Sequence, residues 1–218
     1  MKACRFSSVP SARSTAEAGS SLPVSAREAQ RLATRARLFE AAVAEIGRSG
    51  LAGTDVTKIA GAVGVARGTF YFHFPTKEHV LVELERAEEV RIAAKLTTKK
   101  VGPGDLLALL KLLVREVLDA EQRLGPVVFR DMLALHFAAT RPVEDELVAH
   151  PLASFVITAI TDAQEAGRVS PDADAGELGV IFMTGLFALL ATSPTASRAR
   201  ATLLNRFVKT IVQGMEAR

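Results

Sequence analysis

Apolar residues recur every three or four positions along most of this 218-residue chain, and this spacing restricts its fold more than any other feature. No segment shows the sustained alternation of apolar and polar residues that a half-buried strand requires. We expect the first helix to end near Gly50. Its apolar face consists of Leu32, Ala36, Phe39, Val43 and Ile46. The sequence therefore predicts an all-α protein of about nine helices.

Two short helices are expected next. Thr54 offers a side-chain oxygen to cap the first, and Gly64 ends it with a residue that tolerates left-handed backbone geometry. The helical spacing of apolar residues resumes at Val65 and stops at Pro75. Two short helices joined by a tight glycine turn form the helix-turn-helix pattern.

Proline and glycine punctuate the rest of the chain. Pro151 should kink or split one of the later helices, because proline lacks the amide that a helix interior needs. Asp174 and Glu177 have the spacing of the N-cap and the third residue of another helix. The expected later helices cover about 76–100, 105–121, 126–139, 142–167, 174–191 and 196–216.

Composition and charge exclude several classes of protein. Cys4 is the only cysteine, so a disulfide framework and a cysteine-based metal site are both excluded, and a reducing cytoplasm fits best. We expect no membrane segment, since no run of about 18 residues is wholly apolar. Residues 1–80 hold 11 Lys and Arg against 6 Asp and Glu, whereas 81–218 hold 16 against 18. The basic N-terminal part suggests contact with a polyanion, although a solvated charged face is the other interpretation.

The segment from Phe70 to Phe74 contains four aromatic residues and a histidine in five positions. Phe70 and Phe74 are four residues apart and should fill the core of a small helical head. Tyr71, Phe72 and His73 point elsewhere, and a head of this size cannot bury them all. Outward-facing Tyr71 and His73 would suit phosphate oxygens, unless they only cover the edge of the core.

These residues carry a family resemblance. The stretch TDVTKIAGAVGVARGTFYFHFPTKEHVL, residues 54–81, resembles the DNA-binding signature of the tetracycline-repressor (TetR) family of bacterial regulators. The resemblance implies a helix-turn-helix DNA-binding domain over 26–75 and a helical ligand-binding and dimerisation domain over 76–218. The segment 1–25 is expected to be a disordered tail.

The resemblance also implies DNA contacts. Arg67 falls where the family places a base-reading side chain, and its planar fork could bind guanine in the major groove. Gly68 leaves the helix surface open, and Thr69 would contact a phosphate or a thymine methyl. The expected backbone contacts are Arg35, Thr57, Tyr71, His73 and Lys77.

A regulator of this type works as a homodimer on a palindromic operator, and the expected helix 174–191 is apolar on more than one face. We expect it to pair with its copy together with the last helix, although a monomer that buries both faces is the other option. The expected interface consists of Leu178, Phe182, Gly185, Leu189, Phe207 and Ile211.

The helices between 105 and 167 would enclose a pocket for a small-molecule effector, an apolar molecule and in one interpretation an acidic one. The expected lining is Phe129, Met132, His136, Phe155 and Met183, with Arg115, Arg130 and Thr158 as further polar candidates. Cofactors and metals are not expected.

Two alternatives remain open at this stage. One is a DNA-binding regulator without effector control. The other is an all-α enzyme, in which His136 or His150 acts as a general base beside a carboxylate; the carboxylates considered are Asp131 and Glu146.

Overall fold

The computed structural model describes residues 25–99, 102, 104–142, 150–193 and 198–216. Within these ranges the chain forms nine helices and no strand, which confirms the all-α prediction. The helices are α1 (Ala26–Gly53), α2 (Val56–Val63), α3 (Arg67–His73), α4 (Lys77–Thr97), α5 (Leu106–Leu124), α6 (Pro126–His136), α7 (Pro151–Glu165), α8 (Ala175–Thr192) and α9 (Arg198–Met215). The expected tail, residues 1–24 with Cys4, lies outside the described residues.

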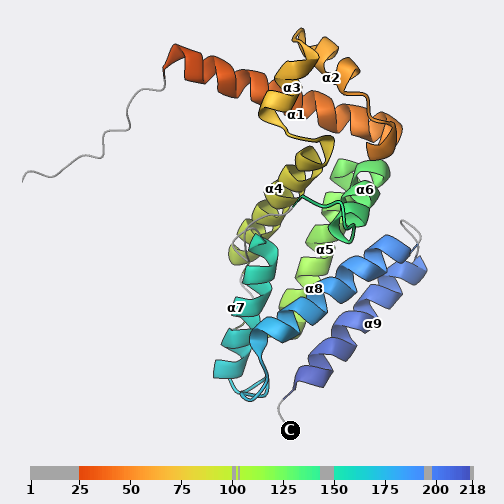
Figure 1. Ribbon diagram of the computed structural model, residues 1–218. Coiled ribbons are helices and arrows are strands. Elements are labelled where there is room, and N and C mark those ends of the chain that lie inside the picture. The colour runs from red at the N-terminus through yellow and green to blue at the C-terminus, as the bar shows by residue number, and fades with distance from the viewer. Residues whose placement is uncertain (1–24, 100–101, 103, 143–149, 194–197, 217–218) are drawn as a thin grey trace, which may run out of the picture.

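The helices form a head and a body (Figure 1). The head consists of α1, α2 and α3 at one end of the molecule. Helix α4 runs from the head into the body, where α5, α6 and α7 surround it, and α8 and α9 lie side by side at the far end. Helix α6 also packs against α1, so the head contacts the body through two helices.

Helix α1 is longer than the head it supports. Its buried face consists of Leu38, Ala42 and Ile46, whereas Leu32 is 47% exposed. The expected stripe was therefore wrong at Leu32 and at Ala36, which is also exposed, because the N-terminal half of α1 extends past α2 and α3 into solvent (Figure 1). Regular helical geometry breaks at Gly50, where φ is 71°, near the expected end.

Local capping explains where the short helices begin and end. The carboxylate of Asp55 caps α2 by accepting from the amide of Thr57 at 2.8 Å. The expectation that Thr54 caps α2 was wrong, because its hydroxyl donates to the carbonyl of Gly50 at 2.7 Å. Gly64 ends α2 in the left-handed conformation, with φ at 76°, as expected.

Two later helix starts follow from the sequence. Asp174 accepts from the amide of Glu177 at 2.9 Å, which confirms the predicted cap of α8. Pro151 is the first residue of α7, where its missing amide costs nothing. The preceding part of the expected helix, 143–149, lies outside the described residues.

The head core is built on the predicted rings. Phe70 and Phe74 are 0% and 1% exposed, and their ring centroids are 5.6 Å apart. This core continues into the body through α4 and α6, which contribute Val80, Leu81, Val82, Leu84, Val128 and Leu135. A displacement of either helix is therefore transmitted to the head by direct packing.

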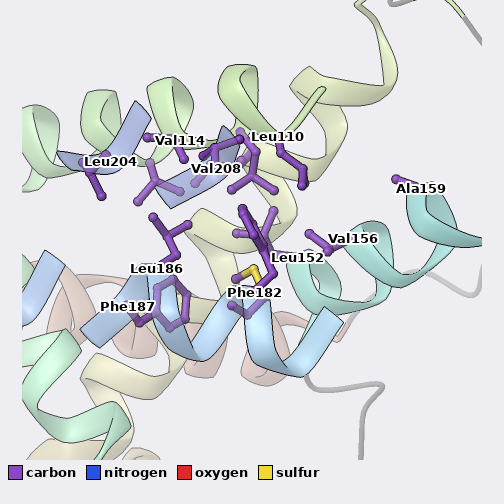
Figure 2. Packing of buried hydrophobic residues seen from close by; sticks show 14 of the residues in the cluster. Leu110, Val114, Leu152, Val156, Ala159, Phe182, Leu186, Phe187, Leu204 and Val208 are labelled. Atoms are coloured by element: carbon purple, nitrogen blue, oxygen red, sulfur yellow. The ribbon is translucent and has the colours of Figure 1, made fainter. Parts of the chain in front are cut away.

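The body core lies between α5, α7, α8 and α9 (Figure 2). Phe182 and Leu186 of α8 are fully buried there, as is Val208 of α9. By length and composition, α8 could also cross a membrane, which the expectation of no membrane segment did not anticipate. In this structure α8 packs against α7 and α9.

Candidate nucleic-acid interface and ligand cavity

Helix α3 presents an open, polar face at the end of the head. Arg67 is its first residue and is exposed. The guanidinium of Arg67 donates to the hydroxyl of Tyr71 at 3.2 Å and lies 5.5 Å from the centre of that ring. A Cβ atom added at Gly68 would meet nothing within 4 Å. This face can therefore approach a groove closely, with Arg67 oriented by Tyr71.

The remaining rings of α3 divide as predicted. Tyr71 is 41% exposed and meets the buried Phe70 edge to face at 5.5 Å, so it both covers the core and reaches solvent. Phe72 is 71% exposed, and its ring lies 5.0 Å from the ring of His73. The sequence analysis gave Phe72 no role, although its position four residues after Gly68 places it on the same open face.

His73 is half-buried at the end of α3. Burial lowers the pKa of His73, and the positive charges of Arg31 and Arg35 lower it further. The imidazole is therefore mainly neutral at pH 7, and it would contact a phosphate as a hydrogen-bond donor rather than as a cation.

Two further predicted DNA contacts differ in their exposure to solvent. Thr57 is exposed, whereas Thr69 is half-buried.

Lys77 has an internal role that the sequence did not reveal. Its ammonium group donates to the carbonyls of Leu51 and of Ala52, the latter at 3.2 Å. These carbonyls belong to the last turn of α1, so Lys77 fastens the start of α4 to the end of α1. An ammonium group has three donors, which leaves one for a phosphate.

Arg35 is also engaged within the chain. Its guanidinium donates both arms to the carboxylate of Glu83 on α4, one of them at 2.7 Å, and it lies 4.6 Å from the centre of the Phe74 ring. A contact of Arg35 with DNA remains a prediction, and it requires release from Glu83. The ion pair joins the head to the helix that enters the body.

The second connection between head and body is a hydrogen bond from α1 to α6. The backbone amide of Leu51 donates to Asp131 at 2.6 Å. Asp131 was one of the carboxylates considered for an enzyme, and the structure assigns it this structural contact instead. The other, Glu146, lies outside the described residues.

A cavity of about 30 Å³ lies inside the body. Of the residues expected to line an effector pocket, Phe129 and Met132 line this cavity, whereas His136, Phe155 and Met183 do not. The wall consists of Glu85, Glu88, Glu89, Ile92, Val117, Ala120, Phe129, Met132, Leu133, Leu152 and Phe187. Helix α4 therefore forms one side of the cavity.

The glutamates beside this cavity hold both body histidines. Glu85 is 2.8 Å from Nδ1 of His136 and accepts from Arg141 at 2.6 Å. Burial raises the pKa of Glu85, but its contacts with His136 and Arg141 outweigh burial, and the pKa is lowered overall.

On the next turn of α4, Glu89 accepts from the amide of Leu152 at 3.2 Å and lies 3.7 Å from Nδ1 of His150. The sequence analysis missed these carboxylates. Their spacing of four residues, which places both carboxylates on one face of α4, was the available signal.

No three His, Cys, Asp or Glu side chains in the described ranges are grouped so as to hold a metal ion. Both histidines of the enzyme alternative are instead paired with glutamates that tie α4 to α6 and α7. This arrangement is a structural network at the wall of the cavity.

The outer face of α8 and α9 is apolar and uncovered in the single chain. Val180, Ile181 and Leu203 are 53%, 55% and 41% exposed. Three expected interface residues, Phe182, Gly185 and Phe207, contact one another within the protomer. Phe182 is fully buried and stacks on Phe207 at 5.6 Å, and a Cβ atom at Gly185 would lie 2.8 Å from that same ring.

The other expected interface residues, Leu178, Leu189 and Ile211, are half-buried. Of the expected interface residues, Phe182 is therefore the one that belongs to the protomer core. An apolar pattern on two sides of a helix does not reveal which side the chain covers itself.

Comparison with known proteins identifies the head. Residues 38–84 match the model of the bacterial regulatory proteins of the tetR family. Over these residues, the head is therefore a TetR-type DNA-binding region. The HTH-type transcriptional regulator AcrR of Shigella flexneri is 32% identical over 88 residues, which is 40% of this chain. That alignment spans 41% of the length of AcrR.

Solved structures extend the likeness to the body, as a similarity of fold. Thermus thermophilus FadR in complex with lauroyl-CoA has a TM-score of 0.65 at 22% identity, and the match covers 84% of this chain and 96% of FadR. RolR in complex with resorcinol has a TM-score of 0.64 at 18% identity, covering 86% and 89%.

Proposed function

We propose that this protein is a transcriptional repressor that binds a palindromic operator as a homodimer and releases it when a small molecule enters the body. It would act in the cytoplasm. The observation that carries this proposal is the open face of α3, where Arg67 is exposed beside Gly68 above a packed aromatic core. Such a helix is suited to the major groove, where a guanidinium can bind guanine through two hydrogen bonds.

Dimer formation is supported by the uncovered apolar face of α8 and α9. Val180, Ile181 and Leu203 would leave water if two copies paired across this face. Such pairing would place two heads on one duplex, with half-sites about 34 Å apart or further.

Effector control is supported by the position of α4, which forms one wall of the cavity and contributes to the head core. An effector must prefer one arrangement of the two heads, since a ligand with equal affinity for both states would shift nothing. The related folds of FadR and RolR hold lauroyl-CoA and resorcinol respectively, which supports a small organic molecule.

The test is DNA binding measured by fluorescence anisotropy over a series of salt concentrations. The duplex from upstream of the protein's own gene is compared with a shuffled duplex of equal length. We expect at least about 10³-fold preference for the native duplex, with both affinities falling as salt rises. Equal affinities would refute operator recognition. If binding is specific but no added metabolite weakens it, the protein is a regulator without effector control.

A further inference from the structure

Two cavities of the body meet at one pair of apolar side chains on α6. The inner cavity is the one described above, of about 30 Å³. The outer cavity is a surface cleft of about 300 Å³ between the start of α6 and the end of α8. Phe129 and Leu133 line both, so these two side chains form the partition between them.

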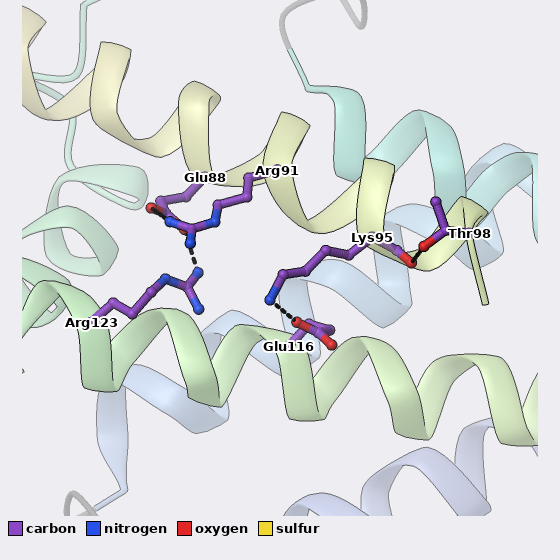
Figure 3. Close-up of polar contacts among 6 residues, drawn as sticks. All are labelled: Glu88, Arg91, Lys95, Thr98, Glu116 and Arg123. Atoms are coloured by element: carbon purple, nitrogen blue, oxygen red, sulfur yellow. Dashed lines mark hydrogen bonds and ion pairs between the residues drawn. The ribbon is translucent and has the colours of Figure 1, made fainter.

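The inner cavity suits an apolar group. Its volume holds about one or two water molecules, so an organic ligand has to extend through the partition. Its charged lining residues are three glutamates whose carboxylates already have partners; Glu88, for example, accepts from Arg123 at 2.7 Å (Figure 3). The rest of the wall is aliphatic or aromatic. A hydrocarbon chain is therefore the group that loses least by entering.

The outer cleft, unlike the inner cavity, offers a positive charge to a ligand. Arg130 lines it, is exposed, and forms no ion pair with a described side chain. The cleft's one carboxylate, Glu121, is neutralised by Arg200 through hydrogen bonds of 3.0 and 2.8 Å.

Helix α6 also begins in this cleft at Pro126, and its cap, Gly125, has no side chain to accept from the first amides. The positive end of a helix dipole and an uncompensated guanidinium therefore face the same space.

We propose that these two cavities form one site for an amphiphile that carries a medium-length hydrocarbon chain and a carboxylate head group. The carboxylate lies against Arg130 in the cleft. The hydrocarbon chain lies along the cleft, and its last carbon atoms displace the Phe129 ring, pass Leu133 and occupy the inner cavity. This proposal rests on the proposed function, because such a molecule would be the effector.

The site would connect to the head without further elements. The end of the hydrocarbon chain would press on α4 at Ile92 and beside Glu85, because both residues line the inner cavity. Closer to the head, α4 is exposed at Arg86. Beyond that point, Glu83 of α4 accepts from Arg35 of the head. Separation of α4 from α6 would thus move the two helices on which the head packs.

The first experiment measures calorimetric binding of dodecanoate, dodecanol and dodecylammonium to the DNA-free protein, below their aggregation concentrations. We expect dodecanoate to bind once per protomer and most tightly. Arg130→Gln should weaken dodecanoate about tenfold, by loss of a charge-assisted hydrogen bond, and leave dodecanol unchanged. Arg115→Gln, an exposed arginine outside both cavities, is the matched control. Equal binding of dodecanol and dodecanoate, or equal effects of the two variants, would overturn the head-group assignment.

The second experiment tests the partition. Octanoate, decanoate and dodecanoate should bind about fourfold more tightly for each added methylene. Phe129→Trp should block the passage and abolish binding, with folding checked by circular dichroism. If this variant does not fold, Leu133→Phe decides in its place. A folded partition variant that binds dodecanoate with wild-type affinity shows that the chain binds elsewhere.

These measurements use free protein, so their failure is distinguishable from failure of the proposed function. A protein that recognises its operator but binds no amphiphile loses this inference and keeps the function. One that binds dodecanoate through Arg130 but ignores its operator keeps the site and loses the function.

Discussion

Arg35 of α1 and Glu83 of α4 form a two-armed ion pair that ties the DNA-binding head to the helix entering the body. Both side chains are about one-third exposed, so the pair contributes no more than about 1 kcal/mol to stability. Its position matters more than its strength. It occupies a cation that would otherwise be available to a phosphate.

Glu83→Gln should therefore increase DNA affinity. The change frees Arg35 to contact a phosphate, so binding to native and shuffled duplexes should strengthen alike and the salt dependence should steepen by about one counterion. Arg35→Ala should have the opposite effect. The measurement is anisotropy at several salt concentrations. If both variants change affinity in the same direction, Arg35 has only a structural role.

Arg67→Ala should reduce specificity more than general affinity. Loss of a two-armed contact to guanine costs about 1–3 kcal/mol of discrimination at one base pair. Arg67→Lys keeps the charge but not the fork, and should lose most of the same discrimination. The measurement compares the operator with its single-base variants. Uniform weakening across all of them would instead assign Arg67 to the backbone.

Lys77→Ala should affect both stability and DNA binding. Loss of the hydrogen bonds to the carbonyls of Leu51 and Ala52 should lower the free energy of unfolding by about 1–3 kcal/mol. Loss of a phosphate contact should weaken all duplexes alike and reduce the salt slope by about 1. Denaturant unfolding and anisotropy measure the two effects. A stability loss with an unchanged salt slope would leave Lys77 only its internal role.

His150 should make stability depend on pH. The contact with the Glu89 carboxylate raises the pKa of His150, despite partial burial and the nearby Arg141. A group whose pKa is raised on folding contributes stability that is fully present below its unfolded value of about 6.5, and is lost as pH rises through the folded pKa.

His150→Gln should therefore lower Tm more at about pH 5.5 than at about pH 8, where the imidazole is neutral in both states. The measurement is thermal unfolding of both proteins in parallel. A Tm difference that is constant over this pH interval would show that the contact with Glu89 carries no proton linkage.

Ile181→Glu should dissociate the dimer. Ile181 is 55% exposed in the single chain, so the change costs the protomer little but places a charge in the proposed interface. Val90→Glu is the matched control, since Val90 is 50% exposed on α4. Sedimentation should show monomers only for the first variant. A wild-type protein that is already monomeric, or two variants that behave alike, would refute this interface.

The sequence was sufficient for the helix-turn-helix because its signals are local. The left-handed turn at Gly64, the break at Pro75 and the i, i+4 pair Phe70 and Phe74 each depend on residues within one or two turns. Local spacing likewise placed the cap of α8 at Asp174. Errors arose where two nearby residues compete for one role, as when Asp55 rather than Thr54 capped α2.

What the sequence by itself determined is thus the set of helices and the outward face of α3, because periodicity and capping act within a single element. Only the tertiary structure decided the partners of each side chain: Glu83 for Arg35, Glu85 for His136, and the protomer's own Phe207 for Gly185. Such contacts join residues far apart in the chain, and they are selected by packing between helices. The spacing of residues along one helix does not determine how far that helix lies from another.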